Sequence, residues 1–318
     1  MTSFARDFHW IHRMPTVRIR SVLLSLLALI ICLPLVTLLS AWLEWNAASA
    51  GVLMAMFNTV LPGYAITSLL LCLGVAVGVT LLGTSTAAAV TLFKFPGKSF
   101  FEWALLLPMA IPAYVVAYAY TDFLQYSGPL QNFIRSQTGL EGRVLPEVRS
   151  LGGAVLVFSL ALYPYVYLLA RTALSERASQ LMEAARMLGA PLQRRILEVA
   201  MPLARPAVAA GVALALMETL ADYGVASYFG IQTLTAGIYK AWLVMDNRIA
   251  AAQLATLLLV VVVMLLAAEQ RAQSRLRFAS TRVDRHGHES QPLKLQGASA
   301  SVAWTLCVLP VLCGFVLP

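Results

Sequence analysis

Long stretches without a charged residue constrain how this chain can fold more than any other feature. The longest lies between Glu44 and Lys94 and has 49 residues, and the turn residues Asn58, Pro62 and Gly63 divide it. An α-helix needs about 20 predominantly apolar residues to cross the hydrocarbon of a bilayer. Only 12% of the 318 residues are charged, about half the share in an ordinary soluble domain. We therefore predict an all-α, polytopic membrane helical bundle and exclude a water-soluble globular domain.

Seven segments are predicted to form membrane helices. They are residues 21–43, 65–93, 103–121, 150–170, 206–225, 249–268 and 298–318, and the seventh is cut short at the end of the sequence. The first has 23 uncharged residues, whereas the apolar region of a cleaved signal peptide has roughly 7–15. We therefore expect the first helix to be a retained anchor.

The basic residues predict the orientation of these helices, because cytoplasmic loops hold an excess of Lys and Arg. If residues 1–20 are cytoplasmic, 18 of the 23 Lys and Arg residues fall on the cytoplasmic side. We therefore expect a cytoplasmic N-terminus. The net charge of +8 then reflects membrane topology and does not call for nucleic acid as a partner.

Two long polar segments are expected in the cytoplasm. Residues 269–297 are rich in basic residues, Ser and Gln, without sustained apolar periodicity, and they are interpreted as a linker. Residues 172–205 are helix-forming instead: a helix that ends at Gly189 is followed by a second short helix that stops before Pro202. Leu181, Ala184, Ala185 and Leu188 recur at helical spacing and form one apolar stripe. Such a compact helical loop suits docking into the groove of a partner.

Two carboxylates interrupt the segment 206–225. Glu218 and Asp222 are four residues apart, so a continuous helix would place them on one face. An ionised carboxylate at the centre of a bilayer costs roughly 2.5–3.5 kcal/mol, so neither should face lipid. With Tyr223 they are candidates to line a translocation path, and the alternative is that they form hydrogen bonds between helices. The sequence holds no catalytic constellation, and His286 and His288 are expected to be solvated, so no metal site is predicted.

The cytoplasmic loop resembles a known motif. Glu183-Ala184-Ala185, three residues, Gly189, nine residues and then Val199-Ala200-Met201-Pro202 is similar to the EAA loop of ABC-importer permeases of the MetI-like type. That family pattern ends in Ile-x-Leu-Pro, so Val199 and Met201 are conservative departures. The resemblance implies the fold of a type I ABC-importer permease.

The resemblance also implies a mechanical role for the loop, as the coupling helix that contacts a dimer of ATPase subunits. The residues implied to carry the contact are Glu183, Ala184, Ala185, Leu188, Gly189 and Pro202. ATP and Mg²⁺ are expected on that partner, because this chain has no GxxxxGK[ST] phosphate loop. The chain is therefore not expected to be an enzyme.

Further segments resemble the permeases of ferric-iron importers. They are Leu107–Tyr114, Gly128–Gln131, Met217–Gly224, Tyr228–Gly230 and Thr235–Tyr239. The resemblance implies ferric iron as substrate and delivery by a periplasmic binding protein at the bacterial inner membrane, with thiamine or a phosphonate as alternatives. Such permeases often fuse two bundles, so residues 298–318 are expected to begin a second one; a second copy of this chain is the other arrangement. An ion-coupled secondary transporter using Glu218 and Asp222 is the alternative from another class.

Overall fold

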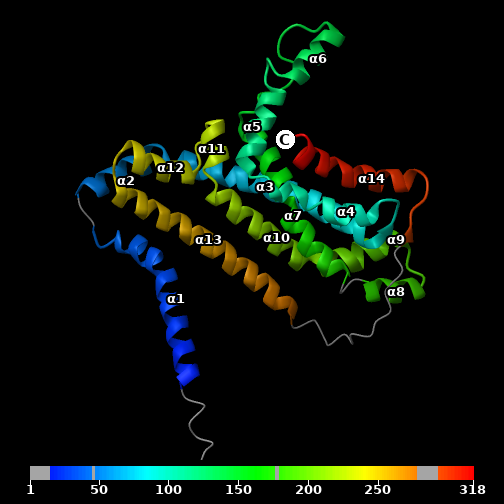
Figure 1. Cartoon of the computed structure of the whole chain (residues 1–318), viewed down its shortest axis with the longest axis horizontal. Helices are drawn as coiled ribbons and strands as arrows, with labels where there is room; N and C mark the ends of the chain where they lie inside the picture. The colour runs from blue at the N-terminus through cyan, green and yellow to red at the C-terminus, as the bar shows by residue number, and fades with distance from the viewer. Residues whose placement is uncertain (1–14, 45–46, 176–178, 278–292) are drawn as a thin grey trace, which may run out of the picture. The chain divides into compact units, whose positions relative to one another are not determined.

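A computed structural model describes residues 15–44, 47–175, 179–277 and 293–318 (Figure 1). Among these residues, six helices are long and apolar enough to cross a membrane, or seven if one sharply bent pair counts as a single span. The all-α membrane bundle predicted from the sequence is confirmed. The elements in chain order are α1 (Pro15–Ser40), α2 (Ala47–Thr59), α3 (Leu61–Leu92), β1 (Phe93–Lys94), α4 (Lys98–Ala104), η1 (Leu107–Ala110), α5 (Ala113–Leu124), α6 (Pro129–Thr138), α7 (Leu151–Ala173), α8 (Ser179–Met187), α9 (Leu192–Arg194), η3 (Arg195–Ala200), α10 (Met201–Ala221), α11 (Gly224–Phe229), α12 (Leu234–Tyr239), η4 (Lys240–Val244), α13 (Arg248–Arg277), β2 (Leu293–Lys294), α14 (Ala298–Val311) and η5 (Leu312–Val316).

The larger of two compact units comprises residues 57–237 and 258–318, and α7 is its central helix. It packs along both α3 and α10 (Figure 1). Glycines allow the close approach of these helices. A methyl group at Gly83 of α3 would lie 2.6 Å from Cβ of Val166 in α7. A methyl group at Gly211 of α10 would lie 2.6 Å from the Cα of the same Val166. Small residues at such contacts let membrane helices pack closely. The sequence of α3 indicates this small-residue face.

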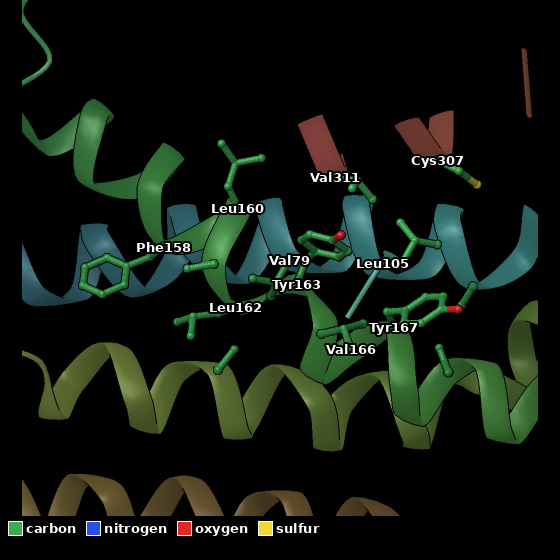
Figure 2. Packing of buried hydrophobic residues seen from close by; sticks show 14 of the residues in the cluster. Val79, Leu105, Phe158, Leu160, Leu162, Tyr163, Val166, Tyr167, Cys307 and Val311 are labelled. Carbon is green, nitrogen blue, oxygen red and sulfur yellow. The ribbon is translucent and has the colours of Figure 1, made fainter. Parts of the chain in front are cut away.

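The core of this unit forms around large side chains of α7. Tyr163 and Tyr167 are fully buried, as is Val79 of α3. Figure 2 shows these side chains close to Leu105, which follows α4, and to Val311 of α14. The hydroxyl of Tyr167 donates a hydrogen bond to the main-chain oxygen of Glu102 at 3.1 Å. The core therefore ties α7 to the segment that begins with α4.

The helix predicted over residues 103–121 is broken, which corrects the expectation of one continuous span. α4 and the 3₁₀ turn η1 lead to Ile111, where the backbone is extended (φ −102°, ψ 124°), and the helical axis turns by 90° before α5 continues. Pro112 disfavours helical geometry at Ile111, because its ring clashes with the preceding residue. The sequence predicts a proline kink here but not its size.

Beyond α5 the chain makes an outer excursion through α6 that two polar side chains hold together. Gln131 is buried: its Nε2 donates to the oxygen of Leu124 at 2.7 Å, and its Oε1 accepts from the N–H of Val144 at 3.1 Å. Arg135 donates to the oxygen of Tyr126 at 2.7 Å and lies 4.3 Å from the centre of its ring. Figure 1 shows α6 projecting from the rest of the larger unit.

The last described segment folds back onto this unit. β2 pairs in parallel with β1, and the N–H of Leu295 donates to the oxygen of Lys94 at 3.0 Å. From there α14 runs along the bundle, where Trp304 meets Phe101 edge to face with ring centres 6.0 Å apart. The hydroxyl of Tyr120 donates to the oxygen of Cys313 at 2.7 Å. Residues 298–318 pack against the first bundle in this structure. That they begin a second bundle stays a prediction.

The smaller unit comprises residues 1–56 and 238–257, and so includes α1, α2, η4 and the beginning of α13. Trp42 donates from Nε1 to Oγ1 of Thr256 at 2.7 Å, and Gln253 donates to the oxygen of Ala41 at 3.0 Å. The apolar stretch Ser21–Ser40 has none of its residues buried in the structure. A helix this apolar needs lipid or another polypeptide around it.

Several helix limits differ from the predicted ranges. α3 begins at Leu61 rather than residue 65, because Pro62 lies in its first turn, where no main-chain donor is needed. α10 spans 201–221 rather than 206–225. α13 continues to Arg277, past the predicted limit at residue 268, because the charged residues that follow the apolar run are also good helix formers. Residues 278–292 of the predicted linker lie outside the described residues.

Gly83→Ala is expected to destabilise the bundle by about 1–3 kcal/mol, because adding a methyl group to a well-packed contact forces neighbouring side chains and backbone to shift. Its control is Gly63→Ala in the same helix, where a methyl group meets nothing within 4 Å; alanine there should leave the melting temperature unchanged or raise it, since glycine is unfavourable within a helix. Thermal unfolding of the detergent-solubilised protein measures both. Equal melting temperatures for the two variants would contradict the close-packed arrangement of α3 and α7.

Candidate functional site

The loop between α7 and α10 is built around α8, and its end is fixed by glycine. Gly189 has φ +79°, a conformation that residues with a Cβ rarely adopt. The N–H of Ala190 donates to the oxygen of Ala185 at 3.0 Å, and that of Gly189 donates to the oxygen of Arg186 at 3.0 Å. These two bonds form a Schellman motif, which satisfies carbonyls left open at a helix end. The predicted helix and glycine turn are both present.

The surface of α8 is apolar and open. Leu188 and Met187 are 88% and 84% exposed, and Leu181 is 51% exposed. Ala184 and Glu183 are exposed as well, while Ala185 is half-buried. Exposed apolar side chains gathered on one short element are typical of an interaction surface. Three residues of the predicted stripe, Leu181, Ala184 and Leu188, therefore face outward, and together with Met187 we call them the apolar α8 surface.

Two residues of the loop are buried, and sequence reasoning missed both. Met182 is 7% exposed and belongs to the core of the larger unit, although it lies one position from the predicted stripe. Arg195 is 8% exposed, and its Nε has no hydrogen-bond partner among the described residues. The apolar stripe in the sequence of this helix predicts a contact surface at Leu181 and Leu188, but it gives no sign that the neighbouring Met182 is buried.

Pro202 does not end a helix, which corrects the sequence prediction. The helical run continues from Leu192 through Ala221, with a π-helical stretch at Arg195–Ala200 before α10. Pro202 is the second residue of α10, and proline is tolerated in the first turn of a helix. The second part of the loop, from Leu192, is therefore continuous with α10, whereas the turn at Gly189 separates α8 from it.

The two carboxylates are not on one helix, contrary to the expectation of a shared face. α10 ends at Ala221, and Asp222 has an extended backbone (φ −70°, ψ 130°). Its Oδ1 accepts a hydrogen bond from the N–H of Val225 at 2.8 Å, in the first turn of α11. Glu218 remains on α10 with its side chain exposed, and Tyr223 is half-buried. The structure therefore separates the role of Asp222, which organises a helix start, from that of Glu218.

Aromatic residues gather near this turn. Tyr118 of α5 and Tyr228 of α11 have ring centres 5.8 Å apart. Arg149 lies 5.3 Å from the ring centre of Tyr228 and donates to its main-chain oxygen at 2.6 Å. Within the described ranges, no group of three or more His, Cys, Asp or Glu could hold a metal ion. His286 and His288 lie outside the described residues.

Comparison with known proteins finds a family that this chain matches. Residues 79–277 match the family "Binding-protein-dependent transport system inner membrane component". The chain is 24% identical over 237 residues to the Fe(3+)-transport system permease protein FbpB 2 of Haemophilus influenzae, covering 74% of this chain and 42% of that protein. It is 28% identical over 177 residues to the putative 2-aminoethylphosphonate transport system permease protein PhnU of Salmonella choleraesuis, covering 54% of this chain and 62% of that protein.

A third relative is the probable sulfate transport system permease protein cysT of Chlorokybus atmophyticus, 28% identical over 223 residues, 68% of this chain and 74% of that protein. The chain thus spans less than two thirds of the length of the first two relatives. Among solved structures, a chain of a bacterial alginate ABC transporter, in complex with an alginate pentasaccharide-bound periplasmic protein, superposes with a TM-score of 0.64 at 17% identity. That match covers 84% of this chain and 96% of the other and shows a shared fold.

Asp222→Ala is expected to lower stability by about 1 kcal/mol, the usual effect of losing a side-chain acceptor at a helix start. Asp222→Asn keeps an acceptor oxygen and should retain the stability of the parent. Thermal unfolding in detergent separates the two. If asparagine destabilised the protein as much as alanine, the hydrogen bond to Val225 would not be the role of this carboxylate.

Proposed function

This chain belongs to the family of binding-protein-dependent transport system inner membrane components, and we propose that it is the permease part of an ABC importer in a bacterial inner membrane. A periplasmic binding protein delivers the substrate, and ATP-driven alternating access moves it across. The N-terminus lies in the cytoplasm, as the distribution of Lys and Arg indicates. ATP and Mg²⁺ are bound by a dimer of partner ATPase subunits.

The observation that carries this proposal is the apolar α8 surface. It lies on a helix whose end is fixed by Gly189, and a second helical run begins after that turn at Leu192 and continues through η3 into α10. Leu188 and Met187 are almost fully exposed, so a partner can cover them without any rearrangement. Glu183 beside them can pair with a basic group of that partner. Closure of the ATPase dimer would then displace α8, and α10 would move with it.

A second permease half, or a second copy of this chain, completes the transporter. Glu218 is exposed on α10, which is an apolar membrane helix. A carboxylate in that position faces a cavity or another polypeptide, because exposure to lipid is costly. The exposed side chains of Tyr114 and Tyr118 lie on α5. We propose that this face, with Glu218, borders the translocation path between the two halves.

Ferric iron is the proposed substrate. It is supported by the segments resembling ferric-iron permeases and by the similarity to the Fe(3+)-transport permease of Haemophilus influenzae. The similarities to 2-aminoethylphosphonate and sulfate permeases support other small solutes as the alternative. Thiamine is a further alternative that rests on the resemblance in sequence alone. An ion-coupled secondary transporter is less well supported, because Asp222 already accepts a main-chain hydrogen bond.

Leu188→Asp and Glu183→Arg are expected to abolish co-purification with the ATPase subunit. Truncating a central contact residue commonly costs about 2 kcal/mol or more of binding free energy, at least a tenfold loss of affinity. Leu140→Asp is the matched control, because Leu140 is a 54% exposed leucine beyond α6 in the outer excursion. Undiminished recovery of the ATPase with Leu188→Asp and Glu183→Arg would overturn the proposal.

The substrate is tested in proteoliposomes that contain the complete transporter and its purified binding protein. Ferric ion bound to that protein should stimulate ATP hydrolysis and be taken up, whereas thiamine, 2-aminoethylphosphonate and sulfate should do neither. Uptake of one of these instead would reject iron while leaving the permease function intact.

A further inference from the structure

Glu102 of α4 is held by α7 through both its side chain and its main chain. Arg171 donates from Nη2 to Oε2 of Glu102 at 2.9 Å and from Nη1 to the main-chain oxygen at 3.4 Å. The hydroxyl of Tyr167 donates to the same main-chain oxygen at 3.1 Å. The planar guanidinium group suits such a two-point contact, which fixes direction as well as distance. The end of α7 and the short helix α4 are therefore joined at one residue.

A second cation lies within reach of the same carboxylate. Lys98, one turn earlier in α4, places Nζ 3.9 Å from Oε1 of Glu102. The side chains of Glu102 and Lys98 are 26% and 22% exposed and that of Arg171 is 37% exposed, so water screens this cluster only in part. Lys98 and Arg171 therefore share one carboxylate, and Arg171 makes the shorter contact with it.

Each end of this contact leads to a functional region. Arg171 lies in the last turn of α7, and α8 begins only a few residues later, at Ser179. Glu102 lies in α4, which continues through η1 to the 90° break before α5. The beginning of α5 then touches the turn after α10, because a methyl group at Gly224 would lie 3.0 Å from Cβ of Tyr114.

We propose that the Glu102–Arg171 ion pair is a positioning link that transmits displacement of the α8 loop to the broken helix α4–η1–α5, and so to the outer turn at Gly224. This inference rests on the proposed coupling of α8 to an ATPase. Movement of the last turn of α7, at Arg171, pulls α4 through Glu102, and the break before Pro112 lets α5 swing while the rest of α7 stays packed on α3. Neither residue touches substrate.

The test follows movement at the outer end of this route. A cysteine at position 114 (Tyr114→Cys), where the side chain is 56% exposed, is labelled with a membrane-impermeant maleimide in the assembled transporter, with and without ATP and vanadate. The parent should show a nucleotide-dependent change in labelling rate of about fivefold or more, the size of a typical coupling between sites. Glu102→Gln should remove that change while the ATPase still co-purifies and hydrolyses ATP.

The exchange of charges in Glu102→Arg with Arg171→Glu should restore at least half of the nucleotide-dependent change, a result that general damage to the fold would not give. Glu147→Gln is the control, because Glu147 forms an exposed ion pair with Arg143 at 3.4 Å that involves neither α4 nor α7. A normal nucleotide response in Glu102→Gln, or no rescue by the exchanged pair, would overturn the link. Loss of ATPase binding in the parent would instead overturn the proposed function.

Discussion

The close packing of α7 against α3 and α10 is the contact on which the rest of the structure depends. Glycines at positions 83 and 211 bring neighbouring backbones against Val166, and no larger residue fits there. In a membrane, helix association relies on such packing, because lipid is as apolar as the side chains it would replace. With α7 held from two sides, the elements at its ends have fixed positions. The α8 loop follows one end, and the outer excursion with α6 precedes the other.

On the proposed function, this arrangement explains how force applied to the α8 loop would reach the rest of the bundle. The apolar α8 surface is fixed by a Schellman turn and by the buried Met182, so force applied to it is not absorbed by a flexible loop. Two connections lead away from the loop. One is the unbroken helix into α10, and the other is the contact of Arg171 with Glu102. Both connections lead to the turn around Asp222 and Gly224, one at the end of α10 and the other through the start of α5.

Sequence reasoning reached the class of fold, most of the membrane helices and the α8 loop, because uncharged length, glycine spacing and the EAA pattern are local signals. It missed features that depend on competition between neighbours. Pro112 breaks a helix whose composition favours continuity, and Asp222 leaves α10 because its carboxylate organises the start of α11. The pairing of β2 with β1 joins segments 200 residues apart, which no local pattern reveals. The role of Glu218 beside a translocation path stays a proposal.

Site-directed cross-linking from the middle of α8 tests the central claim most directly. Ala185→Cys, in membrane vesicles that contain the co-expressed ATPase subunit, should react with an impermeant thiol reagent only from the cytoplasmic face and should cross-link to that subunit. The cross-link yield should change when ATP and vanadate are added. Labelling of this position from the opposite face, or a cysteine that is accessible but never cross-links to the ATPase, would contradict the account.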